Sequence, residues 1–161
     1  MRVRPATVAM ITAVAAIVLG VWDSMQNRRH NRLSVAPYLD CSYTMSATRD
    51  ATAFVIIVSN EGIGPAIVRS VEITMPDNLG GGSYDEWSTP VAALRERGIE
   101  VLSYWNFEPG EALGVQNTQE LLRARVAQAD GAAGLLRYLA DIRVTVTYAS
   151  IYGDEQQAQL N

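Results

Sequence analysis

Lysine is absent from this chain of 161 residues, and cysteine and histidine each occur once, so all thirteen basic residues are arginine. The lack of lysine excludes a Schiff-base nucleophile and the phosphate-binding lysine of a P-loop. The single Cys41 excludes an intramolecular disulfide, and the single His30 excludes a cluster of histidines around a metal ion and argues against a Ser-His-Asp triad. We therefore predict no catalytic residue, no metal site and no cofactor.

Charge is also scarce and unevenly divided. The chain is 48% hydrophobic and 19% charged, which is typical of a folded protein, and its length suits one domain with a short appendage. Residues 1–32 carry five arginines against one aspartate, a net charge of +4, which leaves −8 for the remainder of a chain whose net charge is −4. An acidic domain lacks the positive surface that nucleic acid requires, so we expect no nucleic-acid partner.

Seventeen residues without a charge, 6–22, form the longest apolar run. As a helix they would span roughly 25 Å, the lower limit for crossing a hydrocarbon core of about 30 Å. Basic and aromatic residues at its ends are typical of a membrane interface. These are Arg2, Arg4, Trp22, Arg28, Arg29 and Arg32. We predict a basic head at 1–5, a single-pass transmembrane helix at 6–22 that acts as a signal anchor, and a juxtamembrane stem at 23–33, with the lipid bilayer as a partner.

Other interpretations of this run stay open. A cleaved signal peptide would need a small-x-small site, which LGVWDSMQ does not offer. A buried core helix fits poorly, because the segment is apolar on every face. A pilin-like subunit would have an acidic residue early in the helix, and 6–22 has none. The ridge Ala6, Ala9, Ala13, Ala16 and Gly20 would permit homo-oligomerisation through the helix.

The positive-inside rule compares the arginines on the two sides of the span to predict on which side of the membrane the domain lies. Here the two numbers are nearly equal. A short head before a long folded tail favours the periplasmic or outer side of a bacterial inner (plasma) membrane. The three arginines after the span favour the cytoplasmic side. We place the domain on the periplasmic or outer side.

Residues 34–161 have the patterns of a β domain. We predict strands at 34–45, 51–59, 66–75, 99–107, 112–115, 142–150 and 155–160. Pro37 makes the first an edge strand, and the continuous apolar run at 51–59 predicts a central strand covered on both faces. We predict helices at 90–97, 117–128 and 132–140. Strands joined mostly by turns predict an antiparallel immunoglobulin-like β-sandwich with short helical insertions.

Local signals set several boundaries. Gly62 and Gly64 are expected to supply the turn dihedrals between two strands. Thr89 and Gly98 mark the ends of the first helix, and Asn117 with Glu120 has the spacing of a capping box. Turns are predicted at 108–111 and 151–154.

Three stretches carry a family resemblance: RRHNRLSVAPYL at 28–39, SNEGIGPAIV at 59–68 and TYASIYG at 147–153. They resemble small uncharacterised bacterial proteins with one N-terminal transmembrane helix. In those proteins HNRLSV-x-P leads into the domain and an N-x-G-x-GPA turn joins two strands. Residues 76–140 are unmatched. The resemblance implies the architecture and no functional residue, because the family carries no established activity.

Two residue sets are candidates for function. The first is a partner surface of aromatic residues: Trp87, Tyr104, Trp105 and Phe107. Tyr104 and Trp105 fall on opposite faces of one strand, so either one contacts a partner or helices cover the second face. The second is a set of loop carboxylates that could reach a cleft: Asp85, Glu86, Glu108 and Glu111.

The sequence therefore favours a membrane-anchored, non-enzymatic interaction or scaffold domain with a protein partner. The alternative is a membrane-anchored hydrolase that uses the loop carboxylates. His30 is expected to be a solvated stem residue and Cys41 a small buried hydrophobe. The loop at 80–82 lacks the spacing of a phosphate-binding loop, so we interpret it as a flexible turn.

Overall fold

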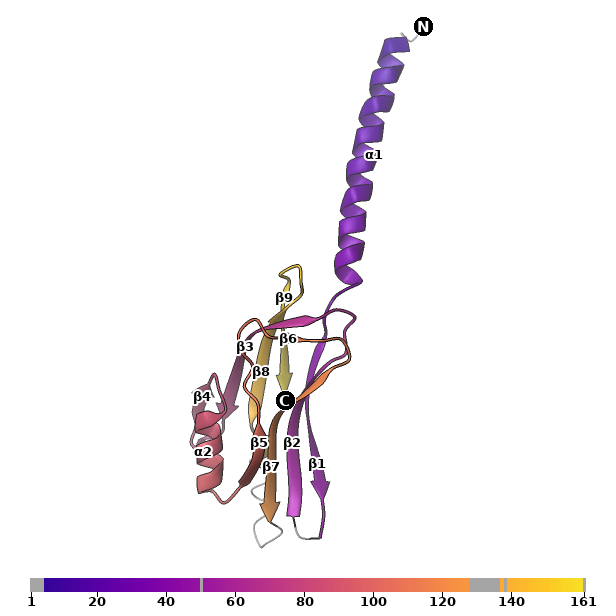
Figure 1. Cartoon of the computed structure of the whole chain (residues 1–161). Coiled ribbons are helices and arrows are strands. Elements are labelled where there is room, and N and C mark those ends of the chain that lie inside the picture. Colours follow the sequence, from indigo (N-terminus) through magenta and orange to yellow (C-terminus); the bar gives the residue numbers. More distant parts are fainter. Residues whose placement is uncertain (1–4, 50, 128–136, 138, 161) are drawn as a thin grey trace. The chain divides into compact units, whose positions relative to one another are not determined.

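The computed structural model describes residues 5–49, 51–127, 137 and 139–160. The chain divides into two compact units, residues 1–35 and 36–161. The first contains one long helix, α1 (Pro5–Leu33), drawn in indigo in Figure 1. Neither glycine nor proline occurs between residues 21 and 33, so the helix continues unbroken through the predicted stem. Over the part of the chain that the structure describes, no helix combines the length and hydropathy needed to cross a membrane.

The second unit contains two antiparallel sheets. One has the order β1-β2-β7-β5, from β1 (Leu39–Ala47), β2 (Ala51–Asn60), β7 (Thr118–Ala127) and β5 (Glu100–Tyr104). The other has the order β4-β3-β8-β9, from β4 (Gly82–Tyr84), β3 (Ala66–Met75), β8 (Arg143–Ala149) and β9 (Glu155–Leu160). A two-residue strand, β6 (Ala112–Leu113), also pairs with β3.

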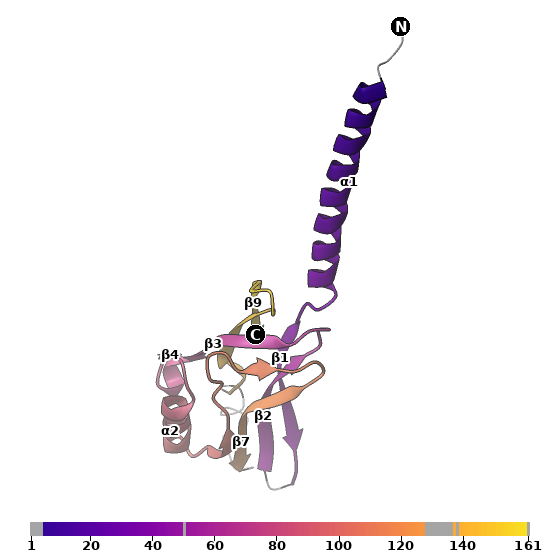
Figure 2. The ribbon, with the colours of Figure 1, turned by 45° about the horizontal axis from the view of Figure 1, so that its top comes forward.

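Two short helices accompany the sheets. They are the 3-10 helix η1 (Asp77–Leu79) and the α-helix α2 (Ser88–Glu96). Helix α2 lies beside β4 in every view of the second unit, most plainly in Figure 2. Leu94 of α2 is fully buried, which attaches the helix to the core.

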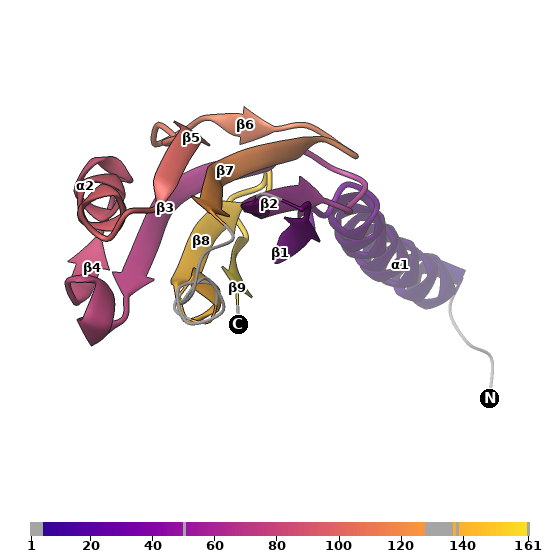
Figure 3. The ribbon, with the colours of Figure 1, turned by 90° about the horizontal axis from the view of Figure 1, so that it is seen from below.

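The two sheets face each other and share one hydrophobic core (Figure 3). Phe54 and Ile56 of β2 and Val144 and Val146 of β8 are fully buried in it. The edge strands β1 and β9 contact each other and join the sheets at one side.

Several predicted elements are confirmed. Strands β2 and β3 and the hairpin of β8 and β9 lie where the sequence predicts them, within a residue or two, and β1 is an edge strand. At the predicted 108–111 turn the Glu111 N–H donates to the Glu108 carbonyl over 2.9 Å. Gly110 has φ +93° at the third position of this turn, and Gly98 has φ +76° just after α2.

The predicted helix at 117–128 is wrong, because these residues form β7 between β2 and β5. Glu120 does not cap a helix, and its carboxylate accepts a hydrogen bond from Nε of Arg123, three residues further along the strand. Leu122, Ala124 and Val126 are buried at alternate positions, and this period-two pattern outweighs the capping box. For the predicted helix at 132–140, positions 132–136 and 138 lie outside the described residues, and Leu139 is buried.

Two finer predictions about β2 and its turn are also wrong. Strand β2 is buried on one face only, since its residues alternate between buried and half-buried. Neither Gly62 nor Gly64 has a positive φ angle, so neither supplies the turn dihedrals that the sequence predicts. A Cβ at Gly62 would lie 2.2 Å from the backbone nitrogen of Tyr38 and 2.6 Å from the carbonyl carbon of Pro37. Gly62 therefore permits a close approach of two backbone segments.

Candidate binding site

Strand β3 has an unpaired stretch along one edge. Its other edge pairs with β8 from Ile67 to Thr74. On the open edge β6 pairs with Ala66 and Ile67, and β4 pairs with Ile73–Met75. No strand pairs with residues 69–72 on this edge within the described part of the chain.

A bulge lies at the start of this stretch. The register of β3 against β8 shifts between Val68 and Ser70, so Arg69 is an extra residue with no counterpart on β8. Ala66 and Val68 point into the core before the bulge, and Ile73 and Met75 do so after it. The bulge thus turns Arg69 and Ser70 outward together, and both are exposed.

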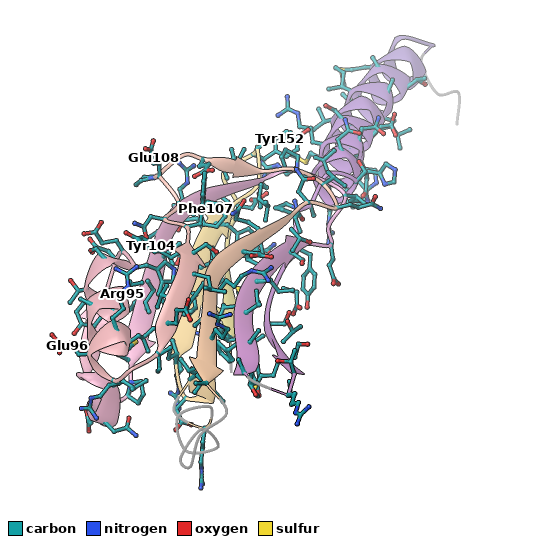
Figure 4. The ribbon with its side chains drawn as sticks, turned by 60° about the horizontal axis from the view of Figure 1, so that its bottom comes forward. Arg95, Glu96, Tyr104, Phe107, Glu108 and Tyr152 are labelled. Atoms are coloured by element: carbon teal, nitrogen blue, oxygen red, sulfur yellow. The ribbon has the colours of Figure 1, made fainter. Side chains whose placement is uncertain are left out.

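A pocket of about 550 Å³ lies along the unpaired stretch and is open to solvent. Its walls come from β3, from the segment between β4 and α2, and from the loop between β5 and β6. The lining residues are Arg69, Ser70, Val71, Asp85, Glu86, Asn106, Phe107, Glu108 and Pro109. Figure 4 shows Phe107 and Glu108 on the loop that follows β5.

Hydrogen bonds fix the loop of residues 106–111 beside β3. The Val68 N–H donates to the Glu111 carbonyl over 2.8 Å, and the Gly110 N–H donates to the Val68 carbonyl over 2.8 Å. The Glu108 N–H donates to Oε2 of Glu111 over 3.1 Å. Since Val68 immediately precedes the unpaired stretch, one wall of the pocket is held in place by backbone bonds.

The opposite wall is held to the same loop through Asn106. The Trp87 N–H donates to Oδ1 of Asn106 over 2.8 Å, and the Trp87 side chain is only 1% exposed. Burial of this large ring anchors the start of α2 and the segment that carries Asp85 and Glu86. Both walls of the pocket are therefore attached to the core.

The pocket is acidic. Asp85, Glu86 and Glu108 face a single guanidinium, that of Arg69, which leaves two excess negative charges. No ion pair joins Arg69 or these carboxylates to another residue in the described ranges. By contrast, Arg123 pairs with Glu120 on β7 and lowers the pKa of that carboxyl through their hydrogen bond. The Ser88 hydroxyl donates to Oε1 of Glu86 over 2.9 Å, which leaves the charge of that carboxylate in place. The negative charge of the pocket can therefore attract an incoming positive group.

The four residues of the predicted aromatic surface do not form one surface in the structure. Trp87 is buried and cannot belong to an exposed surface. Tyr104 and Trp105 are 43% and 44% exposed, so the alternative that helices cover the second face of the strand is wrong. Phe107 is half-buried, packs against the core and lines the pocket. Only Phe107 of the four therefore belongs to the pocket.

The predicted carboxylates are brought together in part. Asp85, Glu86 and Glu108 line one pocket, whereas Glu111 does not line it and instead accepts a hydrogen bond from the Glu108 backbone. Sequence reasoning missed Arg69 and Asn106. The sequence signal for Arg69 was the break in alternation along β3, where both Arg69 and Ser70 are polar between apolar residues.

The predicted interface residues lie on α1 as far as the structure describes them. Trp22 is exposed, and Arg28, Arg29 and Arg32 are exposed in its last turns, as is His30. Arg2 and Arg4 lie outside the described residues.

Cys41 is the small buried residue that the sequence predicts. It lies on β1 opposite Val58 of β2. Burial, with a smaller contribution from the charge of Asp40, raises the pKa of the Cys41 thiol to about 12. The thiol stays protonated at neutral pH and is a poor nucleophile. Among the described residues no cluster of histidine, cysteine and carboxylate side chains could hold a metal ion.

Comparison with known protein families found no family model that matches the chain, and comparison with curated proteins found no matching relative. The resemblance to bacterial single-helix proteins stays a prediction.

Proposed function

We propose that this chain is a membrane-anchored, non-enzymatic interaction domain that binds a positively charged group of its partner in the pocket beside β3. The observation that carries the proposal is the pocket itself, which gathers three carboxylates from two separate segments around one arginine. Phe107 adds an aromatic face that a cation can contact. The hydrogen bonds of Val68 and Asn106 support it further, because a pre-formed site loses little entropy on binding.

Binding of a positive group can be tested with the full chain in lipid nanodiscs and N-acetyl-arginine N-methylamide. At roughly 0.3 kcal/mol for each of its non-hydrogen atoms we expect a dissociation constant of about 0.3 mM. The amide chemical shifts of Ser70, Val71 and Phe107 should change when the compound binds. These changes should become smaller as added salt screens the charges. The matching glutamate compound is the control. Equal shifts for both compounds, or shifts confined to other residues, would contradict the proposal.

A membrane anchor is supported by the described turns of α1. Its large apolar side chains are each more than half exposed and surround the helix instead of following one face. They are Met10, Val14, Ile17, Val18, Leu19, Val21 and Trp22. An apolar surface of this extent needs a covering, and a helix apolar on all sides suits a bilayer. We therefore propose that residues 6–22 span a bacterial inner membrane.

The double substitution Val14→Arg and Val18→Arg is expected to release the full chain from membranes. Each arginine near the middle of a span costs about 2.5–3.5 kcal/mol on insertion scales. The measurement is the fraction of chain left in the membrane pellet after an alkaline carbonate wash. Asn27→Arg with Asn31→Arg adds the same charges at the same spacing outside the apolar run and should stay in the pellet. Wild-type chain in the supernatant would refute the anchor.

We further propose that the second unit is an immunoglobulin-like sandwich. The order β1-β2-β7-β5 corresponds to strands A, B, E and D of that fold, and β4-β3-β8-β9 corresponds to the facing sheet built on strands C, F and G. Strand β6 is an addition beside β3.

A carboxylate hydrolase is the second candidate, because Asp85, Glu86 and Glu108 share one pocket. Glycosidases use two such groups across the scissile bond. A panel of chromogenic glycosides separates the two functions: we expect no turnover, whereas turnover that Glu108→Gln abolishes would favour the hydrolase.

A further inference from the structure

The open edge of β3 offers backbone groups to a second chain. A strand directs half of its N–H and C=O groups to each edge, and those of residues 69–72 that face away from β8 meet neither β4 nor β6. The backbone hydrogen bonds of the loops reach Val68 and go no further along β3 in the described chain. Unpaired groups on a strand edge are a template for strand addition.

The dimensions of the opening define what can enter. Four residues at about 3.3 Å each make an opening of roughly 13 Å, which is the length of a four-residue extended segment. The pocket of about 550 Å³ lies along this same stretch. Val71 is half-buried and packs against the core, so the edge is fixed to the sheet on its inner side. An extended segment could therefore pair with β3 without displacing β4 or β6.

The negative charge of the pocket favours basic side chains in that segment. Asp85 and Glu86 follow β4 at one end of the opening, and Glu108 precedes β6 at the other end, so a segment along β3 runs from one group of carboxylates to the other. Phe107 offers an apolar and aromatic contact from the same loop as Glu108. The residues after position 32 have a net charge of −8, so the field of the whole domain favours basic partners as well.

We propose that the partner segment is an extended peptide with basic side chains, which adds to β3 as a short strand in the opening between β6 and β4. The inference rests on the proposed function and names the class of partner that the pocket takes. Backbone pairing would supply affinity, and the carboxylates would supply selectivity for arginine or lysine.

The first test uses full chain in nanodiscs and a fluorescent, end-blocked tetrapeptide of alternating arginine and valine, which matches the length of the opening. We expect it to bind at least tenfold more tightly than the same peptide with glutamate in place of arginine. Asp85→Asn with Glu108→Gln should weaken the arginine peptide at least tenfold. Glu96→Gln with Glu155→Gln is the matched control, because it removes the same charge from two exposed residues outside the pocket, and it should leave the affinity unchanged.

The second test asks whether the peptide pairs as a strand. Two versions of the arginine peptide carry N-methyl groups on either the arginines or the valines, so that each blocks the N–H groups of one edge only. We expect one version to bind like the parent and the other at least tenfold more weakly, and the tolerated version would give the direction of the added strand. Equal affinity of the two versions would overturn strand addition.

The outcomes separate this inference from the proposed function. If the arginine amide binds but neither N-methylated version differs from the other, the pocket is a charge site and strand addition is wrong. If the arginine amide binds and the tetrapeptide does not, the peptide proposal alone is wrong. If neither ligand binds, both proposals are wrong.

Discussion

Replacing Asn60 by aspartate is expected to destabilise the second unit by about 3–5 kcal/mol at neutral pH. Asn60 is 1% exposed, and its side-chain amide satisfies four backbone groups. Nδ2 donates to the carbonyls of Gly64 and Leu113 over 2.9 and 3.0 Å. Oδ1 accepts from the N–H groups of Tyr38 and Gly62 over 3.3 and 3.0 Å. A carboxylate has the same shape but turns both donated bonds into contacts between oxygens.

The loss of stability caused by Asn60→Asp depends on pH. Burial beside two carbonyls raises the pKa of the introduced carboxyl above its value in the unfolded chain. The folded state then binds the proton more tightly, so the variant is most stable at low pH and loses stability as pH rises. The measurement is the urea midpoint of the full chain at pH 5 and pH 7, with Asn78→Asp as the exposed control. Equal midpoints for Asn60→Asp and Asn78→Asp would show that the buried amide has no such role.

Gly62→Ala is expected to cost about 2–4 kcal/mol, near the upper end of overpacking substitutions. The added Cβ would lie 2.2, 2.6 and 2.7 Å from backbone atoms of Tyr38, Pro37 and Ala36. Backbone atoms cannot rotate away, so either the segment that leads into β1 or the turn after β2 must move. The same movement would break the bond from the Ile63 N–H to the Ala36 carbonyl, now 3.1 Å long.

Thermal unfolding of Gly62→Ala beside Gly98→Ala distinguishes crowding from backbone strain. Gly98 has φ +76° and nothing within 4 Å of an added Cβ, so alanine there costs only the left-handed conformation, about 1–2 kcal/mol. We expect Gly62→Ala to lower the melting temperature by clearly more than Gly98→Ala does. A smaller effect at Gly62 would mean that the two segments are not as tightly packed as described.

These two residues also explain the stretches that carry the family resemblance. Asn60 and Gly62 belong to the N-x-G-x-GPA turn, and Pro37 ends the HNRLSV-x-P stretch. In the fold the turn packs on this stretch through Gly62 and bonds to Tyr38 through Asn60. The two stretches, which are separate in the sequence, therefore contact each other in the fold. Both stretches therefore have a structural role, through the close approach at Gly62 and the hydrogen bonds of Asn60.

Strands with a local signal were predictable, and those set by partners were not. The apolar run that predicts β2 is one continuous segment, and the turn that predicts the hairpin of β8 and β9 joins two neighbouring segments. At the start of β7, Asn117 and Glu120 have the spacing of a capping box, which competes with the period-two pattern of the residues that follow. The pairing of β7 with β2 and β5 settles this competition in favour of a strand. Competition between a local preference and long-range pairing cannot be resolved from one segment alone.

The candidate site shows the same limit. Loop positions made Asp85, Glu86 and Glu108 candidates from the sequence, because such groups can reach a cleft. The pocket itself depends on how far β4 and β6 extend along β3, and on the bulge that turns Arg69 outward. The break in alternation at Arg69 and Ser70 indicates the bulge, but the extent of β4 and β6 is not encoded in β3, so Asn106 could be assigned only with the fold in view.

The state of Cys41 has a practical consequence for anyone who attaches probes to this protein. Because burial raises its pKa to about 12, the Cys41 thiol is almost wholly protonated at pH 7. The native sulfur is therefore expected to react slowly with maleimides and disulfide reagents while the chain is folded. A cysteine added at any exposed position becomes the sole reactive handle, with no need for a cysteine-free background. A spin label or a dye attached there can then report on a chain with the wild-type core.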